Sequence, residues 1–365
     1  MMTLISFTKA RLAGLLVLLW LLSGCASQPE LSADTASALP QQSYISGVPF
    51  HSQRDFQCGP ASLSMALGAS GVDVDVDELI PQVFLPGREG SVQPEMLATV
   101  RRHHRISYPL NGSFDALLSE VNAGNPVVVL QNLGLSILPM WHYAVVIGYD
   151  RARQQLILHS GEQSRQVMEM SRFDATWARS QRWAMVVLPP GELPATLTDT
   201  EAIDSISAFE SANDVEQALP AWQAVVERWP ESALGWFALG NAKHANGDTQ
   251  AALLAFKQAT EQDPKLAAAW FNLGLTQQGL GQTGEAKQSL RKAAALPGQW
   301  QAVRYPRDFV QQQAPLPPCC RLQAAGWCRV PAVRSRWREN AACDAFVCPD
   351  TACGRQFPDR CNNLF

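Results

Sequence analysis

The stretch VPFHSQRDFQCGPASL, residues 48–63, decides the fold of the first half of the chain. Cys58 stands before Gly59 and Pro60, and the residues that follow favour a helix, which we expect over residues 58–69. Proline is tolerated in the first turn of a helix, because the N–H that it lacks has no partner there. The start of a helix carries a partial positive charge, which lowers the pKa of a nearby thiol. The stretch therefore predicts a cysteine whose thiolate is stabilised by the helix that it opens.

Two polar residues outside this helix complete a candidate site. A base for the thiol has to come from a distant part of the chain. His142 opens the apolar run YAVVIGY, residues 143–149, which predicts a buried strand. Gln53 lies shortly before Cys58, where its amide can donate a hydrogen bond to a developing oxyanion. We also expect Gly59 to leave room for a substrate backbone beside the sulfur.

The pattern between residues 46 and 190 is mixed. We expect helices over residues 58–69, 76–84 and 93–103, and strands over residues 127–130, 142–149, 155–159 and 182–188. A helical first third followed by a strand-rich remainder predicts an α+β domain over residues 46–190.

Three motifs, around Gln53, Cys58 and His142, resemble those of a known family. Gln53, the run CGPA from Cys58 and the run HYAVVIGYD from His142 together resemble the bacteriocin-processing cysteine peptidases. Those are papain-like domains that remove double-glycine leader peptides, and the resemblance covers roughly residues 46–189. It implies a papain-like cysteine peptidase fold in which Cys58 is the nucleophile, His142 the base and Gln53 the oxyanion donor.

The chain departs from that family where the histidine is oriented. The family has an aspartate and a proline at the end of the next strand, where this chain has LILHSG, residues 156–161. Ser160 or His159 therefore takes the orienting place, and a neutral group there stabilises an imidazolium less than a carboxylate does. Gln57 also replaces the aspartate that precedes the family's nucleophile. Cys–His–His arrangements occur in peptidoglycan-cleaving relatives of the papain clan, so His159 keeps that activity open.

A second, all-α domain follows a linker at residues 191–198. A set of aromatic, small and apolar residues recurs 34 positions later, with Trp236, Leu239, Gly240, Ala252, Phe256 and Ala259 returning as Trp270, Leu273, Gly274, Ala286, Leu290 and Ala293. This period resembles the tetratricopeptide repeat, and we expect about three repeats over residues 199–298. Such stacks bind protein partners, and Asn241, Lys243, Asn272 and Gln277 are candidates for the concave face.

The N-terminus has the pattern of an export signal. Lys9 and Arg11 precede an apolar run over residues 12–22, which is shorter than the roughly twenty residues of a membrane-spanning helix. The run ends in LSGC, residues 22–25, which resembles the lipobox of bacterial lipoproteins. In that family the cysteine is acylated, for example with palmitate, and becomes the mature N-terminus.

We therefore expect a lipoprotein signal peptide over residues 1–25, with Cys25 as the lipidation site. The polar, Pro- and Ser-rich residues 26–45 predict a flexible tether. Ala26 follows the cysteine where an aspartate would favour retention in the inner membrane. We expect the chain in the cell envelope, held by its lipid anchor in the outer membrane and facing the periplasm.

Composition narrows the classes of partner. Hydrophobic residues make up 47% and charged residues 17% of the chain, as in a globular protein. The net charge of -4 carries no basic stripe, so we expect no nucleic-acid partner. Seven of the nine cysteines crowd into residues 299–365, without the paired spacing of a zinc site. We expect no metal and no cofactor. The tail is either a small disulfide knot or a disordered or out-of-frame extension, and we assign it no function.

Taken together, these features predict a lipoprotein cysteine peptidase of the cell envelope, which hydrolyses peptide bonds through a Cys–His dyad or triad. The repeats would recruit its peptide or protein substrate, or a protein partner. Two alternatives stay open. The first alternative is a catalytically inactive repeat scaffold for envelope assembly. The second is a peptidoglycan or amide hydrolase of the papain clan.

Overall fold

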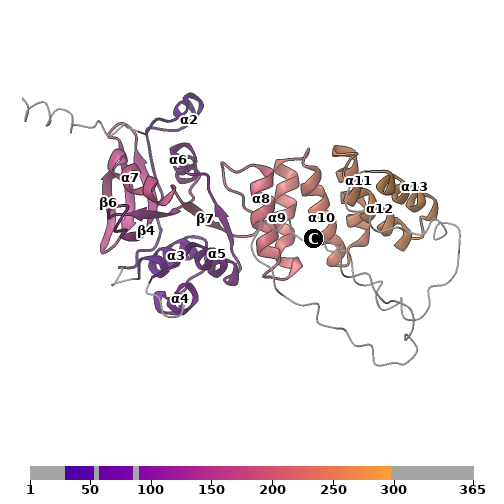
Figure 1. Cartoon of the computed structure of the whole chain (residues 1–365), viewed down its shortest axis with the longest axis horizontal. Coiled ribbons are helices and arrows are strands. Elements are labelled where there is room, and N and C mark those ends of the chain that lie inside the picture. The colour runs from indigo at the N-terminus through magenta and orange to yellow at the C-terminus, as the bar shows by residue number, and fades with distance from the viewer. Residues whose placement is uncertain (1–28, 53–56, 85–89, 297–365) are drawn as a thin grey trace, which may run out of the picture. The chain divides into compact units, whose positions relative to one another are not determined.

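The computed structural model describes residues 29–52, 57–84 and 90–296. In this part of the chain, seven strands form one antiparallel sheet in the order β2-β7-β3-β4-β5-β6, with β1 paired to β4 (Figure 1). The strands are β1 Gln42–Tyr44, β2 Ile106–Pro109, β3 Val127–Asn132, β4 Trp141–Asp150, β5 Gln155–Ser160, β6 Gln163–Glu169 and β7 Ala184–Leu188.

Helices cover both faces of the sheet. One face carries α3 (Cys58–Ala69), α4 (Val76–Val83) and α5 (Gln93–Arg102), and the other carries α6 (Phe114–Asn122) and α7 (Met170–Trp177), which the short helix η1 (Ala178–Ser180) extends. Figure 1 shows α3, α4 and α5 gathered on one side of the strands. The expected α+β domain is therefore confirmed.

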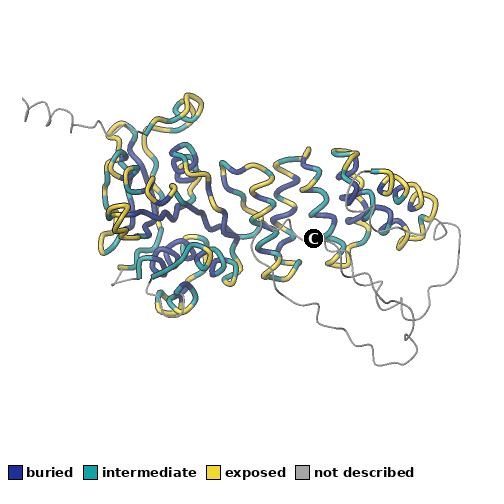
Figure 2. The backbone as a smooth tube through the Cα atoms, viewed as in Figure 1, coloured by how far each residue is buried: buried dark blue, intermediate teal, exposed yellow. Residues whose placement is uncertain are grey.

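Alternation along β4 divides its side chains between the two faces. Tyr143 and Val145 lie in the core beneath α3, whereas Ala144 and Val146 pack with α6 and α7. Helix α3 is buried from Gly59 onward through most of its length, and the strands form the dark core in Figure 2. A helix this buried is held by packing on every side, which fixes the position of the residue at its start.

The expected flexible tether over residues 26–45 is wrong from residue 29 onward. Residues Ala33–Ala38 form helix α2, and β1 pairs with the end of β4. Ser32 donates from its backbone N–H to Asp115 Oδ1 at 3.0 Å, and the Arg151 guanidinium donates to the Leu39 carbonyl at 2.6 Å. These partners lie far away in sequence, which is why local composition alone predicts a loose chain here.

The helical domain consists of α8 (Asp199–Glu210), α9 (Val215–Arg228), α10 (Ala233–Ala245), α11 (Thr249–Gln262), α12 (Ala267–Gly279) and α13 (Thr283–Ala295). The predicted period is visible in equivalent contacts. Trp236 Nε1 donates to the Pro230 carbonyl at 2.8 Å, and Trp270 Nε1 donates to the Pro264 carbonyl at 2.9 Å. A Cβ on Gly240 would meet the Phe256 ring, as one on Gly274 would meet Leu290, so each glycine lets two helices approach closely.

Two polar residues that we expected on the concave face of the repeats are buried instead. Asn272 donates to Asn241 Oδ1 at 2.7 Å, and Gln277 Oε1 accepts from the Ser289 hydroxyl at 2.8 Å. Their amides join neighbouring helices and are therefore not available to a partner.

Several predictions fall outside the described residues. These are the signal peptide, the lipidation site Cys25, the oxyanion donor Gln53 and the tail at 299–365. Within the described ranges, no helix is both long enough and apolar enough to cross a membrane.

Candidate active site

Cys58 is the first residue of α3, as the sequence predicts. Its side chain is partly buried, and the backbone N–H groups of Tyr143, Gly59 and Cys58 itself interact with the sulfur. Tyr143 directly follows His142 in β4. The fold thus brings a sulfur from the start of α3 to the amide group that joins His142 to Tyr143, although 83 residues lie between Cys58 and His142 in the sequence.

Burial dominates the electrostatics of this pair. It raises the pKa of the Cys58 thiol, although the three backbone N–H groups act in the opposite direction. Burial also lowers the pKa of His142. Burial therefore opposes the thiolate that the helix start is expected to stabilise, because loss of water around the sulfur favours the neutral thiol. Both shifts favour the neutral forms, a thiol at Cys58 and an imidazole at His142.

His142 is oriented by Ser160. His142 Nε2 lies 2.9 Å from the Ser160 hydroxyl, which closes the end of β5. Pairing of β4 with β5 sets Val145 opposite His159, so that Ser160 comes one residue nearer to the start of β4. Because Nε2 is engaged, Nδ1 is the ring nitrogen left to receive a proton from the thiol.

His159 has a different role from the one that a Cys–His–His arrangement requires. It is almost fully buried, and its Nδ1 accepts a hydrogen bond from the Arg165 backbone N–H at 3.2 Å. Its Nε2 lies 3.4 Å from the Val48 carbonyl, and its ring packs against Phe50. Nε2 thus fastens Val48 to β5, and Nδ1 joins β5 to Arg165 in β6. Of the two candidates for the orienting position, Ser160 is the one beside His142.

Ser91 is a neighbour of the site that the sequence analysis missed. Its hydroxyl fills the space beside Gly59, where an added Cβ would collide with it. The expectation that Gly59 leaves room for a substrate backbone is therefore wrong, since the glycine admits Ser91. The Ser91 Oγ is buried and has no hydrogen-bond partner among the described residues. The sequence GREGS, residues 87–91, predicts a loop near the cleft, but nothing in it connects Ser91 to Cys58 in particular.

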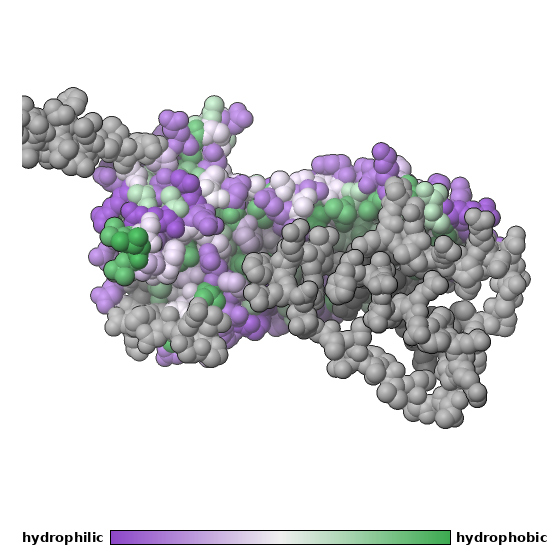
Figure 3. Space-filling model, viewed as in Figure 1, coloured by the Kyte–Doolittle hydropathy of each residue, from purple (hydrophilic) through white to green (hydrophobic). Residues whose placement is uncertain are grey.

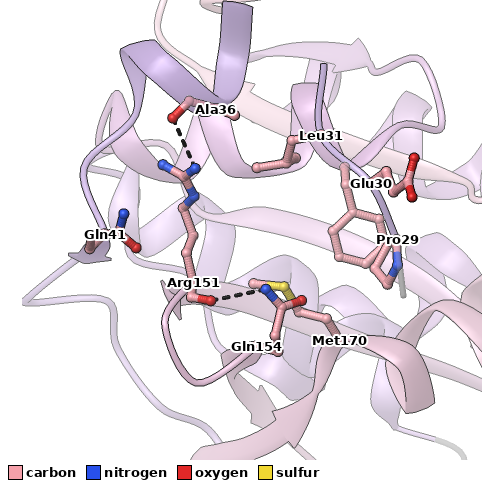
Figure 4. A pocket seen from close by; sticks show the side chains of 9 residues that line it. Pro29, Glu30, Leu31, Ala36, Gln41, Arg151, Gln154 and Met170 are labelled. Carbon is pink, nitrogen blue, oxygen red and sulfur yellow. Dashed lines mark hydrogen bonds between the residues drawn. The ribbon is translucent and has the colours of Figure 1, made fainter. Parts of the chain in front are cut away.

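The pocket in Figure 4 lies away from these residues. It has a volume of about 330 Å³ and adjoins the end of β4 opposite to His142, where Arg151 donates to the Ala36 carbonyl. Its lining consists of Pro29, Glu30, Leu31, Ala36, Gln41, Phe114, Arg151, Gln154 and Met170. None of the candidate catalytic residues lines it. Among the described residues, no group of three His, Cys, Asp or Glu side chains is placed to hold a metal ion.

Comparisons with known proteins agree with this architecture. Residues 45–185 match the Peptidase_C39 like family, and residues 204–267 and 255–288 match tetratricopeptide repeat families. The chain therefore contains a C39-like peptidase domain followed by tetratricopeptide repeats. Repeats of this kind generally mediate contacts between proteins.

Two solved structures match parts of this chain. A C39-like peptidase from Bacillus anthracis is 19% identical and covers 41% of this chain and 98% of its own, with a TM-score of 0.35. The TPR2B domain of yeast Sti1, in complex with pHsp70, is 19% identical and covers 31% of this chain and 88% of its own, with a TM-score of 0.26. No curated protein sequence matches the chain.

Proposed function

We propose that the chain is a cysteine peptidase of the cell envelope, with Cys58 as its nucleophile and His142 as its base. The observation that carries this proposal is the meeting of three elements. The sulfur at the start of α3 lies beside the Tyr143 N–H, and the preceding residue, His142, is held by Ser160. A nucleophile, a base and an orienting group in this order are what acyl transfer requires.

The reaction begins with a neutral pair. The Cys58 sulfur attacks the carbonyl carbon of the scissile peptide bond while its proton passes to His142 Nδ1. The carbonyl π electrons move to oxygen, and that oxyanion accepts hydrogen bonds from the Cys58 backbone N–H and the Gln53 amide. His142 then protonates the leaving amine as the C–N bond breaks, and water hydrolyses the thioester.

Ser160 positions His142 in this scheme. Its hydroxyl fixes Nε2 and so points Nδ1 to the thiol, but it supplies no negative charge to stabilise the imidazolium. The Cys–His–His arrangement of an amide hydrolase loses its support, because both nitrogens of His159 are engaged elsewhere.

Anchoring and recruitment belong to the same proposal. The lipobox at residues 22–25 supports a lipid anchor on Cys25 in the outer membrane, with the domains facing the periplasm. The repeats would bind a protein substrate or a partner. By the family resemblance, double-glycine leader peptides are the first class of substrate to test.

One observation favours a second candidate function. The raised pKa of Cys58 and the neutral orienting residue are also compatible with an inactive peptidase fold that serves as a repeat scaffold. Hydrolysis of fluorogenic peptides separates the two functions. The peptidase loses turnover in Cys58→Ala and in His142→Ala, whereas a scaffold shows no turnover in the wild-type chain either.

A further inference from the structure

The connection between β3 and β4 displays a concentration of exposed apolar side chains. We define it as the apolar hairpin, residues 133–141. Ile137 is 90% exposed and Leu138 is 75% exposed, values at which side chains of this size are almost free of protein contact. The exposed large apolar residues of this segment are Leu133, Leu135, Ile137, Leu138, Met140 and Trp141. Figure 3 shows a compact green group of strongly hydrophobic side chains on the surface of the first domain.

The backbone of the apolar hairpin is fixed rather than loose. Asn132 Oδ1 accepts hydrogen bonds from the N–H groups of Gly134, at 3.0 Å, and Met140, at 2.9 Å. Arg179 donates to the Gly134 carbonyl at 2.6 Å. At Gly134 an added Cβ would run into the Leu138 carbonyl, so the tight turn needs glycine. Because these hydrogen bonds fix the backbone, the apolar side chains of the hairpin stay exposed to water. Exposed apolar patches of this kind mark interaction sites.

The apolar hairpin is continuous with the candidate active site. Its last residue, Trp141, precedes His142 in β4 and is 52% exposed. Asn132 pairs with Trp141, and Gln131 pairs with His142, so the hairpin begins one residue beyond His142 on β4 and two residues beyond Gln131 on β3. The apolar hairpin therefore adjoins the candidate active site through His142.

We propose that the apolar hairpin binds apolar side chains of the polypeptide substrate. This inference rests on the proposed peptidase function and names the surface that selects its substrates. Residues 133–141 contain no charged residue, and the guanidinium of the neighbouring Arg179 is committed to hairpin carbonyls. The surface therefore selects hydrophobic side chains and gives no ionic attraction to an acidic or basic peptide.

A lipid bilayer fits this surface less well than a peptide does. Membrane-binding segments usually flank their apolar residues with lysine or arginine that meet anionic headgroups. The described chain also begins near the opposite end of β4, where Gln42 pairs with Asp150. The ten residues of β4 span about 30 Å at roughly 3.3 Å per residue, so a lipid on Cys25 would hold that opposite end near the membrane.

Peptide binding to the full chain tests the proposal. Cys58→Ala prevents turnover, and fluorescence anisotropy measures the Kd of a labelled peptide rich in leucine and phenylalanine. A second peptide with serine at those positions is the matched ligand. Adding Ile137→Ser and Leu138→Ser should weaken binding of the apolar peptide about tenfold or more and change the serine peptide little. Val167→Ser is the control, because Val167 is 57% exposed on β6.

Three results would overturn the proposal. The first is an unchanged Kd for the apolar peptide in the double variant. The second is an unchanged Kd together with lost co-sedimentation on vesicles of phosphatidylethanolamine and phosphatidylglycerol, which would assign the hairpin to a bilayer. The third is an unchanged Kd together with a dimer that becomes a monomer in sedimentation velocity, which would assign it to a second copy of the chain.

Failure of the peptidase proposal would look different. If the wild-type chain cleaves neither peptide but the double variant still loses affinity for the apolar one, the binding surface stands and the catalytic account fails. If the wild-type chain cleaves both peptides and the double variant retains its kcat/KM for each, catalysis stands and the hairpin surface fails.

Discussion

Ser160 Oγ, at the end of β5, lies 2.9 Å from Nε2 of His142. A hydroxyl can fix the ring but cannot balance the charge of an imidazolium. The same site buries the Cys58 thiol and raises its pKa. A base that is oriented by a neutral group and a thiol whose pKa is raised by burial fit a mechanism in which the proton moves during the attack.

Replacement of Ser160 tests its role as a positioning residue. Ser160→Ala removes one neutral hydrogen bond, and we expect kcat/KM to fall roughly three- to tenfold. Ser160→Asp should raise the pKa of His142, because a carboxylate favours the charged ring. The acid limb of the pH profile then moves to higher pH, which a purely structural role would not produce. Equal pH profiles in wild type and Ser160→Asp would contradict the assignment.

The two pKa shifts predict the pH dependence of the enzyme. The active form needs a neutral His142, whose pKa burial lowers, and a protonated Cys58, whose pKa burial raises. Peptidase activity should therefore be flat through neutral pH and fall only below the ordinary histidine value of about 6.5. Alkylation by iodoacetamide needs the thiolate and should increase only above about pH 8.5. Rapid alkylation at pH 6 would show a thiolate–imidazolium pair and contradict this account.

His159 should make the fold sensitive to acid. Burial lowers its pKa, and its two nitrogens bond Val48 and Arg165 in the neutral form. Below about pH 6.5 the unfolded chain binds the proton more readily than the folded one, so the free energy of unfolding falls as the pH falls. Urea denaturation at pH 7 and pH 5 measures this. His159→Gln should reduce the difference in the free energy of unfolding between the two pH values.

Gly59 is predicted to be intolerant of any side chain. Gly59→Ala forces a methyl group against the Ser91 side chain, and overpacking of this kind costs about 1–3 kcal/mol. Denaturation of the variant measures the loss. The double variant Gly59→Ala/Ser91→Gly removes the colliding atoms and should restore most of the stability. Absence of any rescue would mean that the alanine acts elsewhere.

Much of the fold could be predicted from local sequence. The helix from Cys58 ends at Ala69 as expected, and the strand that includes His142 is part of β4. The 34-residue period is reproduced by the matching contacts of Trp236 and Trp270. These features depend on residues that are close in sequence, or on repetition, and both are visible without a structure.

Other features depend on distant partners. The choice between Ser160 and His159 follows from the pairing of β4 with β5, which periodicity does not fix. The order of residues 29–45 depends on Asp115 and Arg151, and the thiol pKa depends on how tightly α3 is buried. A sequence shows which groups are present, but the loss of solvent around a sulfur is a property of the packed domain.

The most direct test of the central claim is labelling of Cys58 by a peptide that carries an electrophilic carbonyl at its scissile position. Intact mass and peptide mapping then report the modified residue at neutral pH. We predict one adduct, on Cys58, that forms in the wild-type chain and is lost or slowed at least about a hundredfold in His142→Ala. No adduct on Cys58, or one that forms at the same rate without His142, would contradict the account.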